Sequence, residues 1–330
     1  MIAPTERRKP RFAVSTLNPG VDLAARELIV LLTLCVCWGF HFVVVKTAVG
    51  EMPPTFYAAI RMAVVAIVLS PFLRWRPGKM KMLFLAALCF GCINYLLLLN
   101  GVKLATASSS AIANQLYVPF ATVLSVLFLQ EKIGWRRIAG VSLAFAGVAL
   151  IALNRDQGAA GVQIGVGVGL VAGAALVEAT GSILVKKASG FKPWELLAWF
   201  GLVGAPVLMA ASAIFERDQM SALAGADKKI VIGAVLYSAL VASVFGHTAY
   251  YWLIQRRPVS EIAPSSLLTT MFGVAFSVAL LDEPFTIVFF IGGLMTLAGV
   301  GIVVLRTPAA APEPGAPESF IPAPEEEAKP

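Results

Sequence analysis

Charged side chains are scarce in this 330-residue chain. Asp, Glu, Lys and Arg make up 14% of its residues, hydrophobic residues make up 58%, and the mean hydropathy is +0.81. Because a water-soluble domain carries about a quarter charged residues, this composition excludes an ordinary soluble protein and indicates a membrane protein. The net charge of +7 comes from short loops and the N-terminal tail, without the basic stripe and interleaved aromatics that would indicate a nucleic-acid partner.

Metal-ligating residues are also few. The chain has four cysteines and two histidines, and every cysteine falls within an apolar segment. A free thiol in such a segment behaves as a small hydrophobic group, whereas zinc sites are normally built on turns or polar shells. We therefore expect neither a metal site nor a cofactor.

Sequence motifs of nucleotide-driven pumps and membrane-embedded enzymes are absent. No Walker A loop, H-E-x-x-H, G-x-S-x-G or pair of membrane aspartates occurs. The glycine run of residues 165–169 follows no strand, so it is not expected to bind a dinucleotide. These absences disfavour an enzyme and favour secondary transport over ATP-driven transport.

Long apolar segments dominate the chain, and each approaches the length of about 20 residues that a spanning helix needs. We predict ten such helices at roughly 28–47, 55–73, 82–102, 108–129, 137–153, 163–185, 194–215, 230–254, 262–281 and 285–305. Residues 1–27 are expected to form a basic cytoplasmic tail. Residues 306–330 are expected to form a disordered Pro/Ala/Glu tail, because their apolar content is too low to fold.

The distribution of lysine and arginine predicts the orientation of the chain. With the N-terminus inside, the outer loops carry few basic residues and the inner segments carry about three times as many. The outer ones are Lys46, Lys103, Arg155, Arg217, Lys228 and Lys229. We therefore expect a multi-pass inner-membrane protein with both termini in the cytoplasm.

An internal repeat relates the two halves of the chain. The stretch 107–153 recurs at 259–305, about 152 residues later. Matched pairs include Ser108 with Ser260, Glu131 with Glu283, Gly140 with Gly292, and Gly147 with Gly299. Because each half has an odd number of spans, the second half must be inverted. The predicted fold is an all-α membrane protein of ten transmembrane helices, arranged as two inverted five-helix repeats at 28–153 and 163–305.

Inverted repeats favour a transporter that exposes a central site to each side of the membrane alternately. A channel is the competing interpretation, but scattered single polar residues fit a ring-lined pore less well. We expect a small-molecule substrate, protons as a coupling ion, and a monomer or homodimer in the lipid bilayer.

The chain resembles the EamA branch of the drug/metabolite transporter superfamily over nearly all of residues 28–305. The similar motifs include Trp38-Gly39-x-x-Phe42, Met52-Pro53-Pro54 and Ala263-Pro264-x-Ser266. Within that family they are similar to those of bacterial exporters of cysteine and O-acetylserine. The resemblance implies export of amino-acid-like or related amphipathic metabolites, with a broader efflux carrier or a uniporter of another substrate class as alternatives. At two positions the chain differs from the family pattern, where it carries His41 and Glu178.

Four ionisable residues lie well inside the predicted spans, away from their ends, where they are costly unless they face a cavity or a partner. A rise of about 1.5 Å per residue places His41 and Arg61 near the outside and Glu178 and His247 nearer the inside. This estimate predicts two separate polar layers.

Arg61 is predicted to hold a substrate carboxylate, because its planar guanidinium donates two parallel hydrogen bonds to such a group. The alternative is that Arg61 extends outward and pins the helix end, with Glu51 as its partner.

Glu178 is the predicted proton-coupling residue, and His247 is its predicted partner. A carboxyl group in a membrane span can load a proton on one side and release it on the other as access alternates. The alternative is a carboxylate that points into a cytoplasmic water cavity and pairs with Lys186, two turns further along, or with a neighbouring helix.

Neutral polar and aromatic residues complete the predicted substrate site. Its candidate residues are Trp38, His41, Arg61, Asn94, Gln115 and Tyr117. Alternatively, buried amides bond between helices without binding a ligand, and tryptophans near helix ends anchor the interface. Pro119 and Pro206 are predicted kinks, and Gly140, Gly147, Gly292 and Gly299 are predicted helix-packing positions.

Overall fold

The computed structural model describes residues 25–129, 133–154, 159–187, 190–254, 256–257 and 262–305, and its regular structure there is helical. The α-helices are α1 (Ala25–Glu51), α2 (Pro54–Leu69), α3 (Met80–Ala87), α4 (Asn94–Leu104), α5 (Ala107–Asn114), α6 (Tyr117–Leu129), α7 (Trp135–Leu153), α8 (Ala159–Lys187), α9 (Pro193–Phe215), α10 (Gln219–Gly225), α11 (Lys228–Leu236), α12 (Gly246–Ile254), α14 (Ser265–Leu281) and α15 (Ile287–Leu305). Of the predicted tail 1–27, residues 1–24 lie outside these described residues, whereas residues 25–27 belong to α1. The predicted tail 306–330 and the predicted turn at Glu131 and Lys132 also lie outside them.

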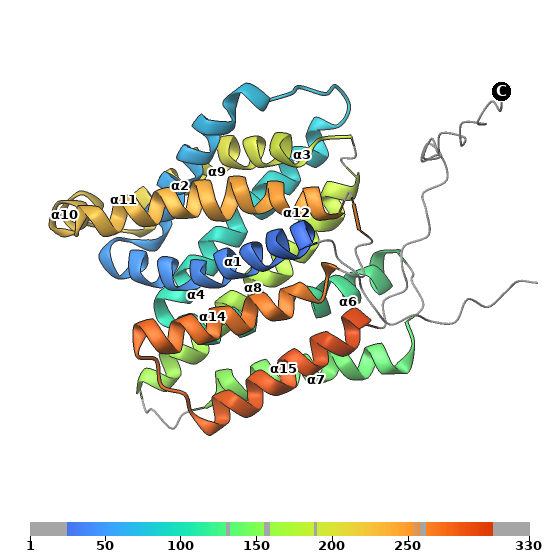
Figure 1. Cartoon of the computed structure of the whole chain (residues 1–330). Helices are drawn as coiled ribbons and strands as arrows, with labels where there is room; N and C mark the ends of the chain where they lie inside the picture. The colour runs from blue at the N-terminus through green and yellow to red at the C-terminus, as the bar shows by residue number, and fades with distance from the viewer. Residues whose placement is uncertain are drawn as a thin grey trace, which may run out of the picture.

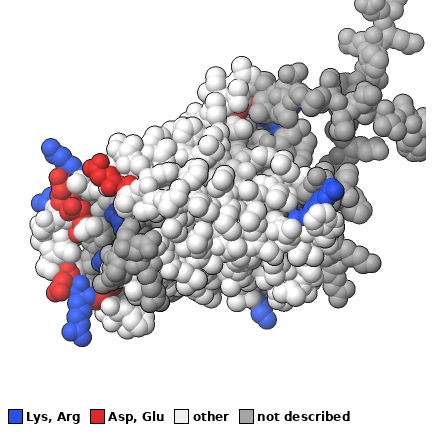
Figure 2. All heavy atoms as spheres, turned by 90° about the horizontal axis from the view of Figure 1, so that it is seen from below, with Lys and Arg blue, Asp and Glu red and all other residues white. Residues whose placement is uncertain are grey.

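Nine segments of the described chain are long and apolar enough to cross a bilayer. They correspond to nine of the ten predicted spans. The remaining prediction, 262–281, corresponds to the apolar helix Ser265–Leu281, which has 17 residues and is shorter than a typical span. Figure 2 shows one face of the molecule, and the middle of that face is largely without charge. Lys, Arg, Asp and Glu gather at one end, and a few more charged residues lie toward the other.

The second predicted span of each half lies antiparallel to the other. Glu216, just after α9, accepts hydrogen bonds from the backbone N–H groups of Thr55 (2.8 Å) and Phe56 (2.9 Å) at the start of α2. At the opposite end, Arg76 follows α2 and forms a 2.9 Å ion pair with Glu195 in the first turn of α9. Equivalent helices that run in opposite directions are the arrangement that an inverted repeat requires.

The fifth span of each half, α7 and α15, meets the other through reciprocal glycine contacts. A Cβ atom on Gly147 would lie 2.5 Å from the carbonyl oxygen of Gly292, and one on Gly299 would lie 2.5 Å from that of Gly140. Gly140 and Gly147 match Gly292 and Gly299 in the repeat, so each helix presents the same surface to its equivalent. Figure 1 shows this pair at one edge of the bundle, with α2 and α9 toward the opposite edge.

Gly147→Ala is expected to destabilise the protein by about 1–3 kcal/mol, because the added methyl group overpacks a backbone contact. Gly169→Ala, within α8, is the matched control, since nothing lies within 4 Å of a Cβ at that position. The measurement is the free energy of unfolding in mixed detergent micelles. Equal stability of the two variants would contradict the close α7–α15 contact.

Several spans depart from a regular α-helix. The fourth span breaks between α5 and α6, where Gln115 and Leu116 donate to carbonyls three residues back. Pro119 causes this break, since it has no N–H for the carbonyl of Gln115. Pro206, in contrast, lies inside the continuous helix α9. The third and eighth spans contain π-helical stretches at Leu88–Ile93 and Tyr237–Phe245, at related positions in the two halves.

The middle of the bundle is built from equivalent helix pairs. Helix α1 packs along α14, and its equivalent α8 packs along α5 and α6. Gly39 of α1 permits the first contact, because a Cβ there would lie 2.7 Å from that of Phe272. The third span also packs against α8, and the eighth against α1. These helices surround one centre, onto which α2 also directs polar side chains.

Candidate functional site

The π-helical stretch Tyr237–Phe245 gathers polar side chains from three other helices. A π-helix inserts an extra residue into a turn and leaves backbone carbonyls available to new donors. The indole N–H of Trp38 donates to the carbonyl of Ala242 (2.9 Å), and the hydroxyl of Ser243 donates to the carbonyl of Ser238 (2.9 Å). The stretch therefore offers both carbonyl and hydroxyl groups to its neighbours.

Arg61 projects from α2 onto this stretch and is buried, with 3% of its surface exposed. Its Nη2 atom donates to the Ser243 hydroxyl (2.9 Å), and its guanidinium carbon lies 4.7 Å from the centre of the Tyr95 ring. Its Nε and Nη1 atoms are buried and have no hydrogen-bond partner among the residues that the structure describes. Arg61 is thus a buried cation with unused donors.

The alternative in which Arg61 extends outward to Glu51 is wrong. The Arg61 side chain is buried against Ser243, and the Glu51 carboxylate accepts a hydrogen bond from the backbone N–H of Asp227 (3.1 Å). Stacking on Tyr95 and the bond to Ser243 hold the guanidinium inside the bundle.

His41 and Tyr57 join Arg61 through the same stretch. The Ser238 hydroxyl lies 3.0 Å from Nε2 of His41 and also forms a hydrogen bond with the Tyr57 hydroxyl. We call His41, Tyr57, Arg61, Ser238 and Ser243 the Arg61 cluster. The structure thereby brings the predicted pair His41 and Arg61 to one site.

His247 lies beside the Arg61 cluster. Its Nδ1 atom is 2.8 Å from the carbonyl of Ser243, and the Ser243 hydroxyl accepts the hydrogen bond from Arg61. The two-layer prediction placed His247 with Glu178 instead. That estimate assumed a regular helix, whereas the π-helical stretch directly before His247 alters both the rise and the direction of the side chains that follow.

Glu178 belongs to a second group of side chains, formed with Tyr117, Ser182 and Tyr250. The hydroxyls of Tyr117 and Ser182 lie 3.0 Å apart, the Ser182 hydroxyl donates to the backbone carbonyl of Glu178 (3.1 Å), and Glu178 and Tyr250 both lie near Tyr117. We call these four residues the Glu178 cluster. No hydrogen bond or ion pair of the Glu178 carboxylate is seen among the described side chains, and that of its alternative partner Lys186 is not among them.

Trp38 packs beside residues of both groups. Its ring centre lies 5.8 Å from that of His247 and 6.0 Å from that of Tyr250. The indole therefore links the surroundings of the Arg61 cluster to the Glu178 cluster. Trp199, at the end of the bundle near Arg74, instead donates its indole N–H to the Arg74 carbonyl (3.1 Å).

Asn94 and Gln115 both bond between helices. The Asn94 amide donates to the Ala174 carbonyl of α8 (3.0 Å). The Gln115 amide donates to the Ser266 carbonyl (2.6 Å) and to the Thr270 hydroxyl of α14. Both amides therefore donate to neighbouring helices. This agrees with the alternative interpretation, in which buried amides connect helices and do not bind a ligand.

Tyr57, Tyr95, Ser238 and Ser243 were not singled out from the sequence. Tyr57 precedes Arg61 by one helical turn, which is the only local signal that could have found it. Tyr95 and the serines contact Arg61 or His41 from other helices, and small hydroxyl residues in apolar spans are too common to mark a site.

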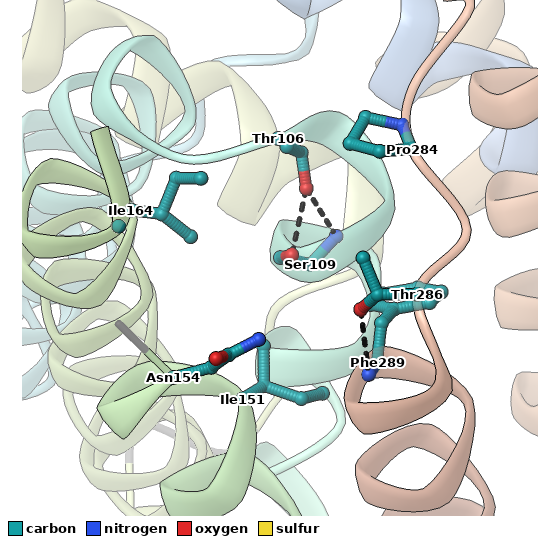
Figure 3. A pocket seen from close by; sticks show the side chains of 9 residues that line it. Thr106, Ser109, Ile151, Asn154, Ile164, Pro284, Thr286 and Phe289 are labelled. Atoms are coloured by element: carbon teal, nitrogen blue, oxygen red, sulfur yellow. Dashed lines mark hydrogen bonds between the residues drawn. The ribbon is translucent and has the colours of Figure 1, made fainter. Parts of the chain in front are cut away.

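A separate hollow lies at the predicted outer end of the bundle (Figure 3). Thr106 and Ser109 of the α5 start form one wall, and Pro284 and Thr286, just before α15, face them. Ile151 and Asn154 at the end of α7 line its base. The hollow is therefore bordered by both halves of the protein.

Comparison with known proteins gives consistent results. The chain is 25% identical to a "Probable amino-acid metabolite efflux pump" of Escherichia coli over 289 residues, covering 86% of this chain and 96% of that protein. It is 26% identical to the Salmonella typhimurium protein of the same description, with the same coverage. A solved structure with 16% identity superposes with a TM-score of 0.58 over 85% of this chain and 96% of its own, which supports the fold. A sequence model of the EamA-like transporter family matches residues 25–153 and 165–305, and the chain therefore belongs to this family of membrane transporters.

Proposed function

We propose that the protein exports small amino-acid-like metabolites across the inner membrane by alternating access, with Arg61 holding the substrate carboxylate. The observation that carries this proposal is the buried guanidinium of Arg61, whose Nε and Nη1 atoms have no acceptor in the described part of the chain. Within the described residues, no carboxylate pairs with it.

A buried charge without a counter-ion costs several kcal/mol. Binding of an anionic substrate would supply the missing counter-ion. A carboxylate fits the planar guanidinium by two parallel charge-assisted hydrogen bonds. Tyr57, Tyr95 and Trp38 would surround the rest of a small molecule with aromatic surface. The names of the Escherichia coli and Salmonella relatives agree with an amino-acid metabolite as cargo.

Alternation follows from the two inverted halves, 28–153 and 163–305, which can exchange conformations around a shared centre. Glu178, in the second cluster, is the residue we propose to carry a proton between the two sides. In this proposal, both termini are cytoplasmic and the substrate moves outward.

Counterflow in proteoliposomes tests the function. Vesicles loaded with unlabelled substrate are expected to accumulate labelled substrate transiently, because a carrier exchanges one for the other whereas a channel or an enzyme does not. The first probes are L-cysteine, O-acetyl-L-serine and L-serine, each beside its amide. Accumulation of none of the acids would contradict the amino-acid assignment, and accumulation of a neutral compound alone would favour a broader efflux carrier.

A further inference from the structure

We propose that Lys46 and Glu283 form a latch that holds the predicted outer end of the transporter closed. The two residues grip the corner between α4 and α5, which we define as residues 104–108. The latch rests on the proposed alternating access, since only a protein that opens to both sides needs one.

Lys46 of α1 holds the carbonyl side of the corner. Its ammonium group donates to the carbonyls of Val102 (2.9 Å), Lys103 (3.1 Å) and Ala105 at the end of α4. These carbonyls lack partners within the helix, and a cation at a helix C-terminus also complements the helix dipole.

Glu283 holds the amide side of the same corner. Its carboxylate accepts from the backbone N–H groups of Ala107 and Ser108 (2.9 Å for Ser108) and from the Ser108 hydroxyl. The preceding residue, Asp282, takes a left-handed backbone conformation with φ of 50°, which ends α14 and turns Glu283 toward α5. An anion at the start of a helix is the charge that its free N–H groups favour.

Lys46 on α1 and Glu283 after α14 are expected to move together, because α1 and α14 pack along each other. The α4 side of the corner packs closely on α8. A Cβ on Gly167 of α8 would lie 2.5 Å from the backbone nitrogen of Ala105, and one on Gly101 would lie 2.8 Å from the Gly167 carbonyl oxygen. Opening the outer end is therefore expected to part the corner from α1 and α14, and to break the bonds of Lys46 and Glu283.

The hollow of Figure 3 borders this junction, with Thr106 and Ser109 on the corner side and Pro284 on the Glu283 side. Lys46 and Glu283 are both partly exposed, so water can solvate their charges once they separate. The latch is consequently reversible, in contrast to the dry glycine contacts between α4 and α8.

The test measures how fast a cysteine behind the latch reacts with a membrane-impermeant maleimide. Ala111→Cys is placed in a chain whose native cysteines are serines, because Ala111 is 2% exposed and packs toward Gly273 of α14. Glu283→Gln or Lys46→Met is expected to raise the labelling rate from the outer side at least tenfold. Amide hydrogen exchange of the peptide spanning 104–112 is expected to accelerate in the same variants, also without the cysteine.

Glu216→Gln is the matched control, because Glu216 likewise holds two backbone N–H groups but within the α2–α9 pair. It should leave labelling and exchange at the corner unchanged. Unchanged rates in Glu283→Gln, or an equal rise in Glu216→Gln, would overturn the latch. Neither readout requires a substrate, so the latch and the transport function are tested independently. Unchanged labelling with intact counterflow would contradict the latch alone, and faster labelling without counterflow would contradict the transport function alone.

Discussion

Replacing Arg61 by glutamine is expected to slow counterflow of an amino-acid substrate by about 100-fold, the loss that corresponds to about 2.8 kcal/mol of binding free energy. Glutamine cannot supply the charge or the paired donors that Arg61 directs into the site. The buried position of Arg61 strengthens the effect, because water cannot replace the lost interaction. The measurement is initial counterflow in proteoliposomes with matched protein content.

Two comparisons separate this role from a purely structural one. Arg61 also bonds Ser243 and stacks on Tyr95, so its loss could disturb the helices. We expect Arg61→Gln to spare transport of the corresponding amide, and Arg61→Lys to retain part of the carboxylate flux. Arg217→Gln, at an exposed position beyond α9, should behave as wild type. Equal losses for acid and amide substrates would show that Arg61 supports the fold and not the substrate.

The spans and their inversion could be predicted from the sequence because they depend on local properties. Apolar length predicts a spanning helix, and the odd number of spans per half requires inversion. The reciprocal contact of Gly147 with Gly292 follows the same logic, since matched small residues at helical spacing predict close packing. The break before Pro119 was also predictable, because proline lacks an N–H.

The site itself was predictable only in part. The depth estimated along a regular helix predicted that His41 lies at the level of Arg61, and in the structure the two residues belong to one cluster. The same estimate separated His247 from them, because nothing local in the sequence reports a π-helical stretch before His247. The inward direction of the Arg61 side chain could not be predicted from the sequence either, because its partner Ser243 lies on a span from the other half of the chain. Such tertiary contacts decide whether an arginine points inward or toward the membrane surface.

The acid–base chemistry of the second cluster leads to a different expected result. Glu178→Gln should abolish accumulation of substrate driven by a pH gradient while leaving counterflow in place. One pH unit supplies about 1.4 kcal/mol per proton, so coupling to a single proton supports about tenfold accumulation. Glutamine is neutral at every pH and carries no proton, so accumulation in the variant should fall to about the level without a gradient. Counterflow should persist, because it needs no net proton movement.

The matched control for Glu178 is Glu216→Gln, which removes a carboxylate from the end of the bundle and should keep its response to the pH gradient. Glu178→Asp keeps the carboxyl group at a shorter reach and should retain part of that response. His247→Gln tests whether the histidine beside the Arg61 cluster also carries the proton. If the proton passes only through Glu178, the His247→Gln variant should respond to the pH gradient almost as wild type does. A Glu178→Gln protein that still accumulates substrate in a pH gradient would place the coupling group elsewhere, with His41 and His247 beside Arg61 as the next titratable groups to replace.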